Sequence, residues 1–166
     1  SIEGLRCYPS LSSLPEAPDV VLVGVRASLV PGVIEECSRI GAGFAVIFSS
    51  GFAESDDADA QKRIVEVARA GGVRILGPNC QGLVNLAGGI PLSFSASLDT
   101  DRRPEGHVAY VSQSGAFGFA SFAMAADAGA GFRYVVTTGN QSDLDVIDFA
   151  RFLSEDPEVR LLLLYL

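Results

Sequence analysis

Basic residues are scarce in this chain of 166 residues. Lysine occurs once, at Lys62, histidine occurs once, at His107, and the formal net charge is -8. The arginines are scattered instead of being gathered into one basic stretch. Because nucleic-acid-binding proteins present clustered positive charge to the phosphate backbone, this composition argues against an extended nucleic-acid-binding face. An apolar content of 48% indicates a globular protein with a packed core.

Cysteines and long apolar runs are also few. Cys7, Cys37 and Cys80 are odd in number and form no Cys-x-x-Cys pair, so the sequence predicts neither a disulfide framework nor a metal site. The opening SIEGLRCYPS lacks the basic start and apolar centre of a signal peptide, and the closing LLLLYL is too short to cross a bilayer. We therefore expect a cytoplasmic protein that does not bind membranes.

The common hydrolase and dinucleotide motifs are incomplete. A serine hydrolase elbow requires G-x-S-x-G, and here Ser112 stands two residues before Ser114 where the glycine would be. His107 falls at the opposite end of the same predicted strand from these serines, so a catalytic triad is not expected. No complete G-x-G-x-x-G follows a strand, which argues against half of a nucleotide-binding oxidoreductase.

Strand and helix signals alternate along the first half of the chain. Apolar runs typical of buried parallel strands occupy 19–25, 44–48 and 73–76. Helical periodicity fills 31–40, after Pro31, and 60–70, before two glycines. This βαβαβ order predicts a parallel sheet covered by helices.

The same pattern restarts in the second half. Residues 83–97 resemble short extended pieces, and 99–106 read as a polar linker. Strands are then predicted at 107–111, 133–137 and 160–166, with helices over 116–128 and from Val146 to near Pro157. We therefore predict an α/β fold with doubly wound parallel sheets, in two units separated at the linker. Since the chain opens on a loop and closes on an apolar strand, we expect it to be a piece of a longer protein.

A hydroxyl-rich turn, VSQSG, joins the strand at 107–111 to the following helix. A helix N-terminus has backbone N–H groups without intrahelical partners and a partial positive charge, so it can hold a phosphate without a lysine. Ser112, Ser114 and Gly115 are the candidate residues. Ordinary helix capping by serine explains the same spacing, and the spacing favours neither interpretation.

Three further turns follow predicted strands. The turn GPNCQG carries Asn79, whose amide could face a ligand, although a tight turn explains it as well. Cys80 has no neighbouring histidine or lysine in sequence and is interpreted as a packed thiol. The other two turns contain Val25 with Arg26, and Phe48 with Ser49 and Ser50. Four such turns together favour a ligand-binding edge, because ligands gather at the carboxyl ends of strands in open α/β sheets.

Acidic residues follow the strand at 133–137. Asp143, Asp145 and Asp148 could be read as metal ligands. Their spacing suits capping of the helix that starts at Val146, since carboxylates near a helix N-terminus are stabilising. We therefore predict a structural role for them.

The order of these motifs resembles a known family. The segments PDVVLVGVRA, AVIFSSGFAE, ILGPNCQGLVN, GHVAYVSQSGAFG and TTGNQSDLDVIDFARFLSEDPEVRLLLLYL are similar to those of NDP-forming acyl-CoA synthetases, which include the succinyl-CoA synthetase alpha subunit and ADP-forming acetate–CoA ligase. The resemblance implies a Rossmann-like CoA-binding domain, here its later part at residues 1–100. It also implies a flavodoxin-like ligase domain, here its first part at residues 105–166.

The resemblance also implies roles for the turn residues. Val25, Arg26, Phe48, Ser49 and Ser50 match turns that line CoA. Asn79 matches the loop beside the reacting acyl group, and Ser112, Ser114 and Gly115 match the helix start that receives the phosphate of a phosphohistidine.

The implied reaction converts acyl-CoA, phosphate and NDP into the free acid, CoA and NTP through an acyl phosphate and a phosphohistidine. The histidine is expected beyond Leu166, so no catalytic residue is assigned within the chain, and this piece alone is expected to be inactive. The nucleotide, with Mg²⁺, is expected on an ATP-grasp domain or beta subunit outside these residues, and an oligomer is expected. The alternative is a non-catalytic CoA-binding or assembly subunit with the same fold.

Overall fold

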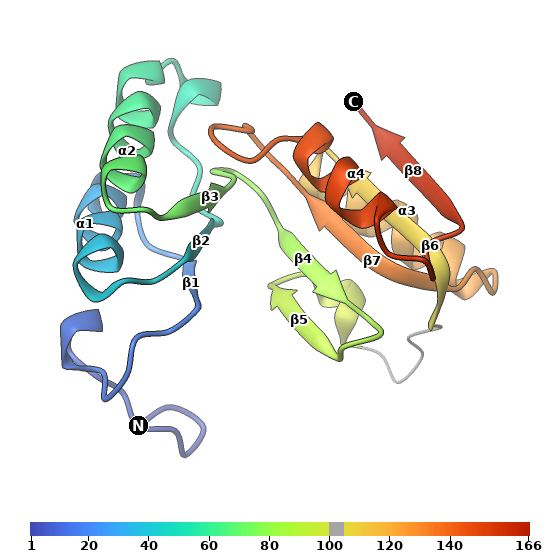
Figure 1. Cartoon of the computed structure of the whole chain (residues 1–166), viewed down its shortest axis with the longest axis horizontal. Coiled ribbons are helices and arrows are strands. Elements are labelled where there is room, and N and C mark those ends of the chain that lie inside the picture. Colours follow the sequence, from blue (N-terminus) through green and yellow to red (C-terminus); the bar gives the residue numbers. More distant parts are fainter. Residues whose placement is uncertain (100–104) are drawn as a thin grey trace.

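A computed structural model describes residues 1–99 and 105–166 of the protein, and its strands form two sheets (Figure 1). The first sheet contains β1 (Val20–Val23), β2 (Phe44–Ile47) and β3 (Arg74–Leu76), all parallel and in sequence order. Its crossovers are α1 (Val30–Ile40) and α2 (Ala58–Ala70). The βαβαβ order predicted for this half is confirmed.

Both crossover helices begin and end at local signals. Proline stands in the first turn of α1, and Gly41 ends that helix in the left-handed conformation, with φ 79°. The N-cap of α2 is Asp57, whose carboxylate accepts a hydrogen bond from the Ala60 N–H at 3.0 Å. The two helices pack on the same face of the sheet, and the buried residues between helices and sheet include Ile34 and Ile64.

The second sheet has five strands in the order β5-β4-β7-β6-β8. Their bounds are β4 (Gly82–Asn85), β5 (Ile90–Ser93), β6 (Glu105–Ser112), β7 (Phe132–Thr137) and β8 (Leu161–Tyr165). Strand β6 runs parallel to both β7 and β8, whereas β4 is antiparallel to β5 and β7. The α/β fold with parallel strands is therefore confirmed, with an antiparallel edge that the sequence interpretation did not include.

Helices cover both faces of this second sheet. The helix α3 (Gly115–Asp127) buries Phe119 and Phe122 against one face. The helix α4 (Val146–Ser154) packs Val146 and Leu153 in a cluster with strands β6 and β7. Because that cluster also contains Val46 and Leu76 of the first sheet, the two sheets share a hydrophobic core. Short 3₁₀ helices occur at η1 (Leu11–Ser13), η2 (Ala27–Leu29), η3 (Ala53–Ser55) and η4 (Ala96–Leu98).

The strand pairing differs from the predicted separation at residues 99–106. Strands β4 and β5 precede that linker, yet β4 pairs with β7, with Val84 opposite Val135. The last strand of the first sheet, β3, ends at Leu76, and the next strand, β4, begins at Gly82 and is hydrogen-bonded in the second sheet. The boundary between the two sheets therefore lies between these residues. The partner strand of β4 lies far along the chain, and short extended pieces carry no local signal of such a partner. The segment 100–104 of the predicted linker lies outside the described residues, and the domain division at 100–105 stays a prediction.

Within residues 1–99 and 105–166, no helix is both long and apolar enough to span a bilayer. The same described residues contain no group of three or more histidine, cysteine or acidic side chains placed to hold a metal ion.

Candidate functional site

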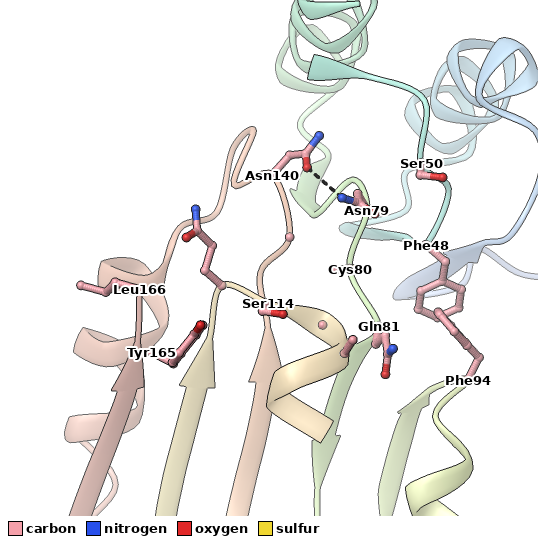
Figure 2. A pocket seen from close by; sticks show the side chains of 14 residues that line it. Phe48, Ser50, Asn79, Cys80, Gln81, Phe94, Ser114, Asn140, Tyr165 and Leu166 are labelled. Atoms are coloured by element: carbon pink, nitrogen blue, oxygen red, sulfur yellow. Dashed lines mark hydrogen bonds between the residues drawn. The ribbon is translucent and has the colours of Figure 1, made fainter. Parts of the chain in front are cut away.

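A cavity of about 720 Å³ opens where strands of both sheets reach their carboxyl ends. Figure 2 shows the side chains around it. The lining residues follow strands β2, β3, β5, β6 and β7 or lie at the end of β8: Phe48, Ser50, Asn79, Cys80, Gln81, Phe94, Gln113, Ser114, Gly115, Ala116, Gly139, Asn140, Tyr165 and Leu166. Among the predicted site residues, the structure thus brings together Phe48, Ser50, Asn79, Ser114 and Gly115.

The first turn of α3 lies at this cavity. Ser114 is the N-cap, and its hydroxyl accepts a hydrogen bond from the Phe117 N–H at 3.2 Å. The first intrahelical bond runs from the Gly118 N–H to the Ser114 carbonyl. The N–H groups of Gly115 and Ala116 precede that bond and belong to two cavity-lining residues. Helix capping is therefore what the Ser114 hydroxyl does here, and the backbone donors beside it suit an anion.

Ser112 has a different place from Ser114. It is fully buried and does not line the cavity. Its hydroxyl donates to the Ser114 carbonyl at 2.8 Å, directly below the helix start. A Cβ on Gly118 would lie 2.9 Å from the Ser112 Cβ, so the first turn of α3 sits tightly on this serine. Ser112 therefore braces the turn from inside.

The GPN turn is held against both sheets. The Gly77–Pro78 peptide is cis, and Asn79 has a left-handed backbone with φ 57°, a conformation that asparagine tolerates better than most residues. The Asn79 N–H donates to the Ser49 carbonyl at 2.9 Å. On the other side, the Gln81 N–H donates to the Thr137 hydroxyl at 3.0 Å. The turn is thus anchored to the end of β2 and to the end of β7.

Gly115 lies where this turn meets α3. A Cβ on Gly115 would lie 3.0 Å from Gln81 Cγ and 3.1 Å from the Gln81 backbone nitrogen. These distances are shorter than most Cβ contacts, so a side chain here would require Gln81 to shift by a few tenths of an ångström. The candidate phosphate-binding and acyl-binding residues are therefore neighbours in space.

Cys80 has the environment of a packed thiol. It is buried, and its Sγ–H donates to the Ile47 carbonyl at 3.4 Å. Burial raises the pKa of this thiol to about 12, which keeps it protonated at neutral pH.

The turn after β2 supplies the third side of the cavity. Phe48 packs edge-on against Phe94, with ring centroids 5.1 Å apart. Ser50 is exposed and lines the cavity, whereas the Ser49 hydroxyl donates to the Val25 carbonyl. Ser49 therefore joins the turn after β1 to the turn after β2.

Val25 and Arg26 lie outside this cavity. Val25 lines a separate groove of about 710 Å³ that runs along β1 and α1. Arg26 is exposed and lines neither space. The turn after β1 thus lies one strand away from the cavity, and the Ser49 contact links it to the turn after β2.

Sequence reasoning missed another turn at the cavity, the one after β7. Gly139 and Asn140 line the cavity, and Asn140 accepts a hydrogen bond from the Asn79 side chain at 3.3 Å (Figure 2). The segment TTGN also follows an apolar strand, so the rule that identified the other turns could have identified this one.

The aspartates after this turn have structural roles. Asp145 and Asp148 form a reciprocal capping box at the start of α4, as predicted. The Asp143 carboxylate accepts hydrogen bonds from Arg74 Nε at 2.8 Å and from the Ile75 N–H at 3.0 Å.

Comparisons with known proteins cover almost the whole chain. A CoA binding domain matches residues 1–85, and a succinyl-CoA ligase like flavodoxin domain matches residues 105–166. The chain is 37% identical to acetate–CoA ligase [ADP-forming] I of Archaeoglobus fulgidus, over 99% of this chain and 24% of that protein. It is 36% identical to acetate–CoA ligase [ADP-forming] I subunit alpha of Pyrococcus furiosus, over 97% of this chain and 34% of that subunit.

A solved structure agrees with these matches. The dinucleotide forming acetyl-coenzyme A synthetase 1 of Ca. Korarchaeum cryptofilum, in complex with phosphate and ADP, superposes with a TM-score of 0.93 at 34% identity. The match covers 100% of this chain and 35% of that one. The chain thus spans about a quarter to a third of the length of the relatives described here.

Proposed function

Because the chain belongs to the family of NDP-forming acyl-CoA synthetases, we propose that it supplies the CoA-binding turns and the phosphate-binding helix start of an acid–CoA ligase. The reaction converts acyl-CoA, phosphate and NDP into the free acid, CoA and NTP. The observation that carries the proposal is the cavity of about 720 Å³, because one space is lined by the start of α3, the GPN turn and the turn after β2.

The start of α3, the GPN turn and the turn after β2 each have a part in this reaction. A phosphate held by the N–H groups at the start of α3 attacks the thioester carbonyl, the C–S bond breaks, and the CoA thiolate leaves as the acyl phosphate forms. Asn79 lies beside the acyl group, and Phe48 and Ser50 line the path of the CoA arm. Fixed N–H dipoles suit an anion that changes partners, because they need no reorganisation during the transfer.

The phosphoryl group then passes to a histidine and from it to NDP. The one histidine of this chain does not serve, since His107 lies at the opposite end of β6 and its Nδ1 is 2.8 Å from the Glu158 carbonyl oxygen. We propose that residues outside this chain supply the histidine and that an ATP-grasp module or partner subunit binds the nucleotide with Mg²⁺. The name of the Pyrococcus furiosus relative, a subunit alpha, supports a partner subunit.

The test compares Ser114→Asn with Ser114→Asp in the full-length protein, together with any partner subunit. Asparagine, aspartate and serine are similarly good N-caps, so both variants are expected to keep the stability of α3 within about 0.5 kcal/mol. The Asp variant also places a negative charge where phosphate binds. With acetyl-CoA, phosphate and Mg·ADP as substrates, we expect its kcat/KM for phosphate to fall at least about tenfold below that of the Asn variant.

The outcomes separate the two functions left open by the sequence. Equal phosphate kinetics in both variants and the wild type would show that the SQSG turn is only a helix cap. A wild-type protein that binds CoA but forms no ATP with any acyl-CoA tested would instead support the non-catalytic CoA-binding subunit.

A further inference from the structure

One side chain, Asn140, connects the turns around the cavity. Its Nδ2 donates to a Glu54 carboxylate oxygen and, at 2.9 Å, to Gln61 Oε1. Its Oδ1 accepts from Asn79 Nδ2 at 3.3 Å. Both amide hydrogens and the carbonyl oxygen of Asn140 are therefore engaged by three different elements: η3, α2 and the GPN turn.

The Glu54 carboxylate extends the connection to the turn after β2. It accepts hydrogen bonds from the backbone N–H groups of Gly51 and Phe52, the latter at 3.2 Å. Burial alone would raise the pKa of Glu54, but the hydrogen bonds from Asn140 and from these N–H groups lower it. Glu54 is therefore ionised at neutral pH and acts only as an acceptor.

The backbone beside Asn140 makes the other connections. The Asn140 N–H donates to the Pro78 carbonyl at 2.9 Å, and the Gly139 N–H donates to the Gln113 carbonyl at 3.0 Å. These two consecutive residues therefore link the GPN turn to the SQSG turn.

Glu54, Asn140 and Asn79 are linked in series by side-chain hydrogen bonds, and the Glu54 carboxylate sets the orientation of both amides. Since Glu54 can only accept, Asn140 presents its NH₂ group to Glu54 and its carbonyl oxygen to Asn79. Asn79 must then present its NH₂ group to Asn140. The Asn79 carbonyl oxygen and the second hydrogen of its NH₂ group are left for a ligand in the cavity.

We propose that Asn140 is a positioning residue, which holds the three turns together and orients Asn79 so that its carbonyl oxygen accepts a hydrogen bond from the bound CoA thioester. CoA thioesters carry amide N–H donors along the pantetheine arm, so an acceptor suits this ligand. This inference rests on the proposed ligase function. It adds a residue that orients the site without touching the reacting atoms.

The test uses two substitutions in the full-length protein, one that replaces the Asn140 amide by a carboxylate and one that replaces the Glu54 carboxylate by an amide. Asn140→Asp places a second carboxylate against Glu54 and removes the donor between them. Adding Glu54→Gln restores a donor–acceptor pair in the opposite direction, because the introduced glutamine can donate to the introduced aspartate. That aspartate can still accept from Asn79, and the Gln61 amide can rotate to donate to it. Asn79 keeps an acceptor at residue 140 in the single and in the double variant, so the comparison between them reports the contact between residues 54 and 140.

We expect Asn140→Asp to raise the KM for acetyl-CoA about ten- to hundredfold, and the double variant to return to within about threefold of the wild type. Assays are run below the melting temperature of every variant, so that loss of folded protein does not contribute. The matched control is Asn85→Asp, at the end of β4 and not among the residues that line the cavity. It keeps the oxygen that accepts from the Gly88 N–H at 2.8 Å and should leave the KM unchanged.

Calorimetry with CoA accompanies the kinetics. If the wild type binds CoA and turns over acetyl-CoA while Asn140→Asp has an unchanged KM, the positioning role is wrong. A double variant as impaired as the single one would overturn it too. If the wild type neither binds CoA nor turns over acetyl-CoA, the proposed ligase function fails, and the positioning role fails with it.

Discussion

At the scale of single residues, burial separates side chains that look alike in the sequence. Ser112 and Ser114 are two positions apart, yet one hydroxyl braces the turn from inside and the other caps α3 at the cavity. Cys7 is exposed, whereas Cys37 and Cys80 are buried. Residues of one type therefore have different contacts and different exposure in this protein.

The cysteines provide a direct test of this difference. In native protein treated with iodoacetamide at pH 8, we expect Cys7 to be alkylated while Cys80 is spared. Burial raises the pKa of Cys80 to about 12, so only about 1 in 10⁴ of these thiols is ionised at pH 8. Burial also raises the pKa of Cys37. Peptide mass spectrometry measures the labelling, with urea-denatured protein as the control in which all three react. Labelling of Cys80 as fast as Cys7 would contradict its packed environment.

At the scale of elements, the loop between β7 and α4 is bound along the end of β3 like an additional strand. The N–H groups of Asn140, Ser142 and Leu144 donate to the carbonyls of Pro78, Gly77 and Ile75, at 2.9, 3.1 and 3.1 Å. These contacts place Asn140 at the cavity. They also make the loop a continuous polar connection between the two sheets.

Asp143 anchors this loop, and its removal should cost stability. Its carboxylate is 5% exposed and pairs with Arg74 at 2.8 Å and Arg69 at 3.5 Å. We expect Asp143→Asn to lower the free energy of unfolding at pH 7 by about 1.5–3 kcal/mol, measured by urea denaturation. The control Asp59→Asn removes an exposed pair with Lys62, where the atoms are 3.6 Å apart, and should cost at most about 0.5 kcal/mol. Equal losses of unfolding free energy in the two variants would show that Asp143 stabilises the protein no more than an exposed ion pair does.

The same variant predicts a dependence on pH. Burial by itself would raise the pKa of Asp143, but the hydrogen bonds from Arg74 and Ile75 and the nearby arginine charges lower it overall. A carboxyl with a lowered folded-state pKa contributes stability above its unfolded-state pKa of about 3.9 and loses it as the pH falls further. The difference in unfolding free energy between wild type and Asp143→Asn should therefore narrow from pH 7 to pH 3. A constant difference would contradict the ion pair.

At the scale of the whole molecule, the turns at the ends of the two sheets are in contact at Gly139. A Cβ at this position would lie 2.3 Å from the Pro78 carbonyl oxygen and 2.5 Å from that of Asn79. The backbone there also has a positive φ of 58°. The β7–α4 loop and the GPN turn can therefore be in contact only because Gly139 has no side chain.

Replacing Gly139 by alanine, beside a control glycine, should separate the cost of the left-handed backbone from the cost of the close contacts of the added Cβ. The matched control is Gly89→Ala, where φ is 64° and nothing lies within 4 Å of the added Cβ. We expect the control to cost about 1–2 kcal/mol from the left-handed backbone alone. Gly139→Ala should cost at least about 2 kcal/mol more, because two backbone carbonyls must move. Urea denaturation of the full-length protein measures both, and equal costs would show that the two turns separate freely.

Local signals in the sequence determined the elements of this protein. The apolar runs, Pro31 before α1, Gly41 after it and Ser114 before α3 predicted the helices and parallel strands that the structure contains. Capping and periodicity depend on residues within a few positions of one another, so they can be read without the fold. The same signals marked the four turns, and the carboxyl-end rule for parallel strands predicted that turns would form a site.

Only the tertiary structure decided which residues meet. The pairing of β4 with β7, the burial of Ser112 and the position of Arg26 outside the cavity depend on how segments distant in the sequence pack together. Asn140 meets Glu54 across 86 positions and Asn79 across 61. Nothing in the local sequence records such a contact, because an amide hydrogen bond depends on geometry that distant segments create together. The sequence by itself determined the elements and where their turns lie, and the packing of one sheet against the other decided which turns share a cavity.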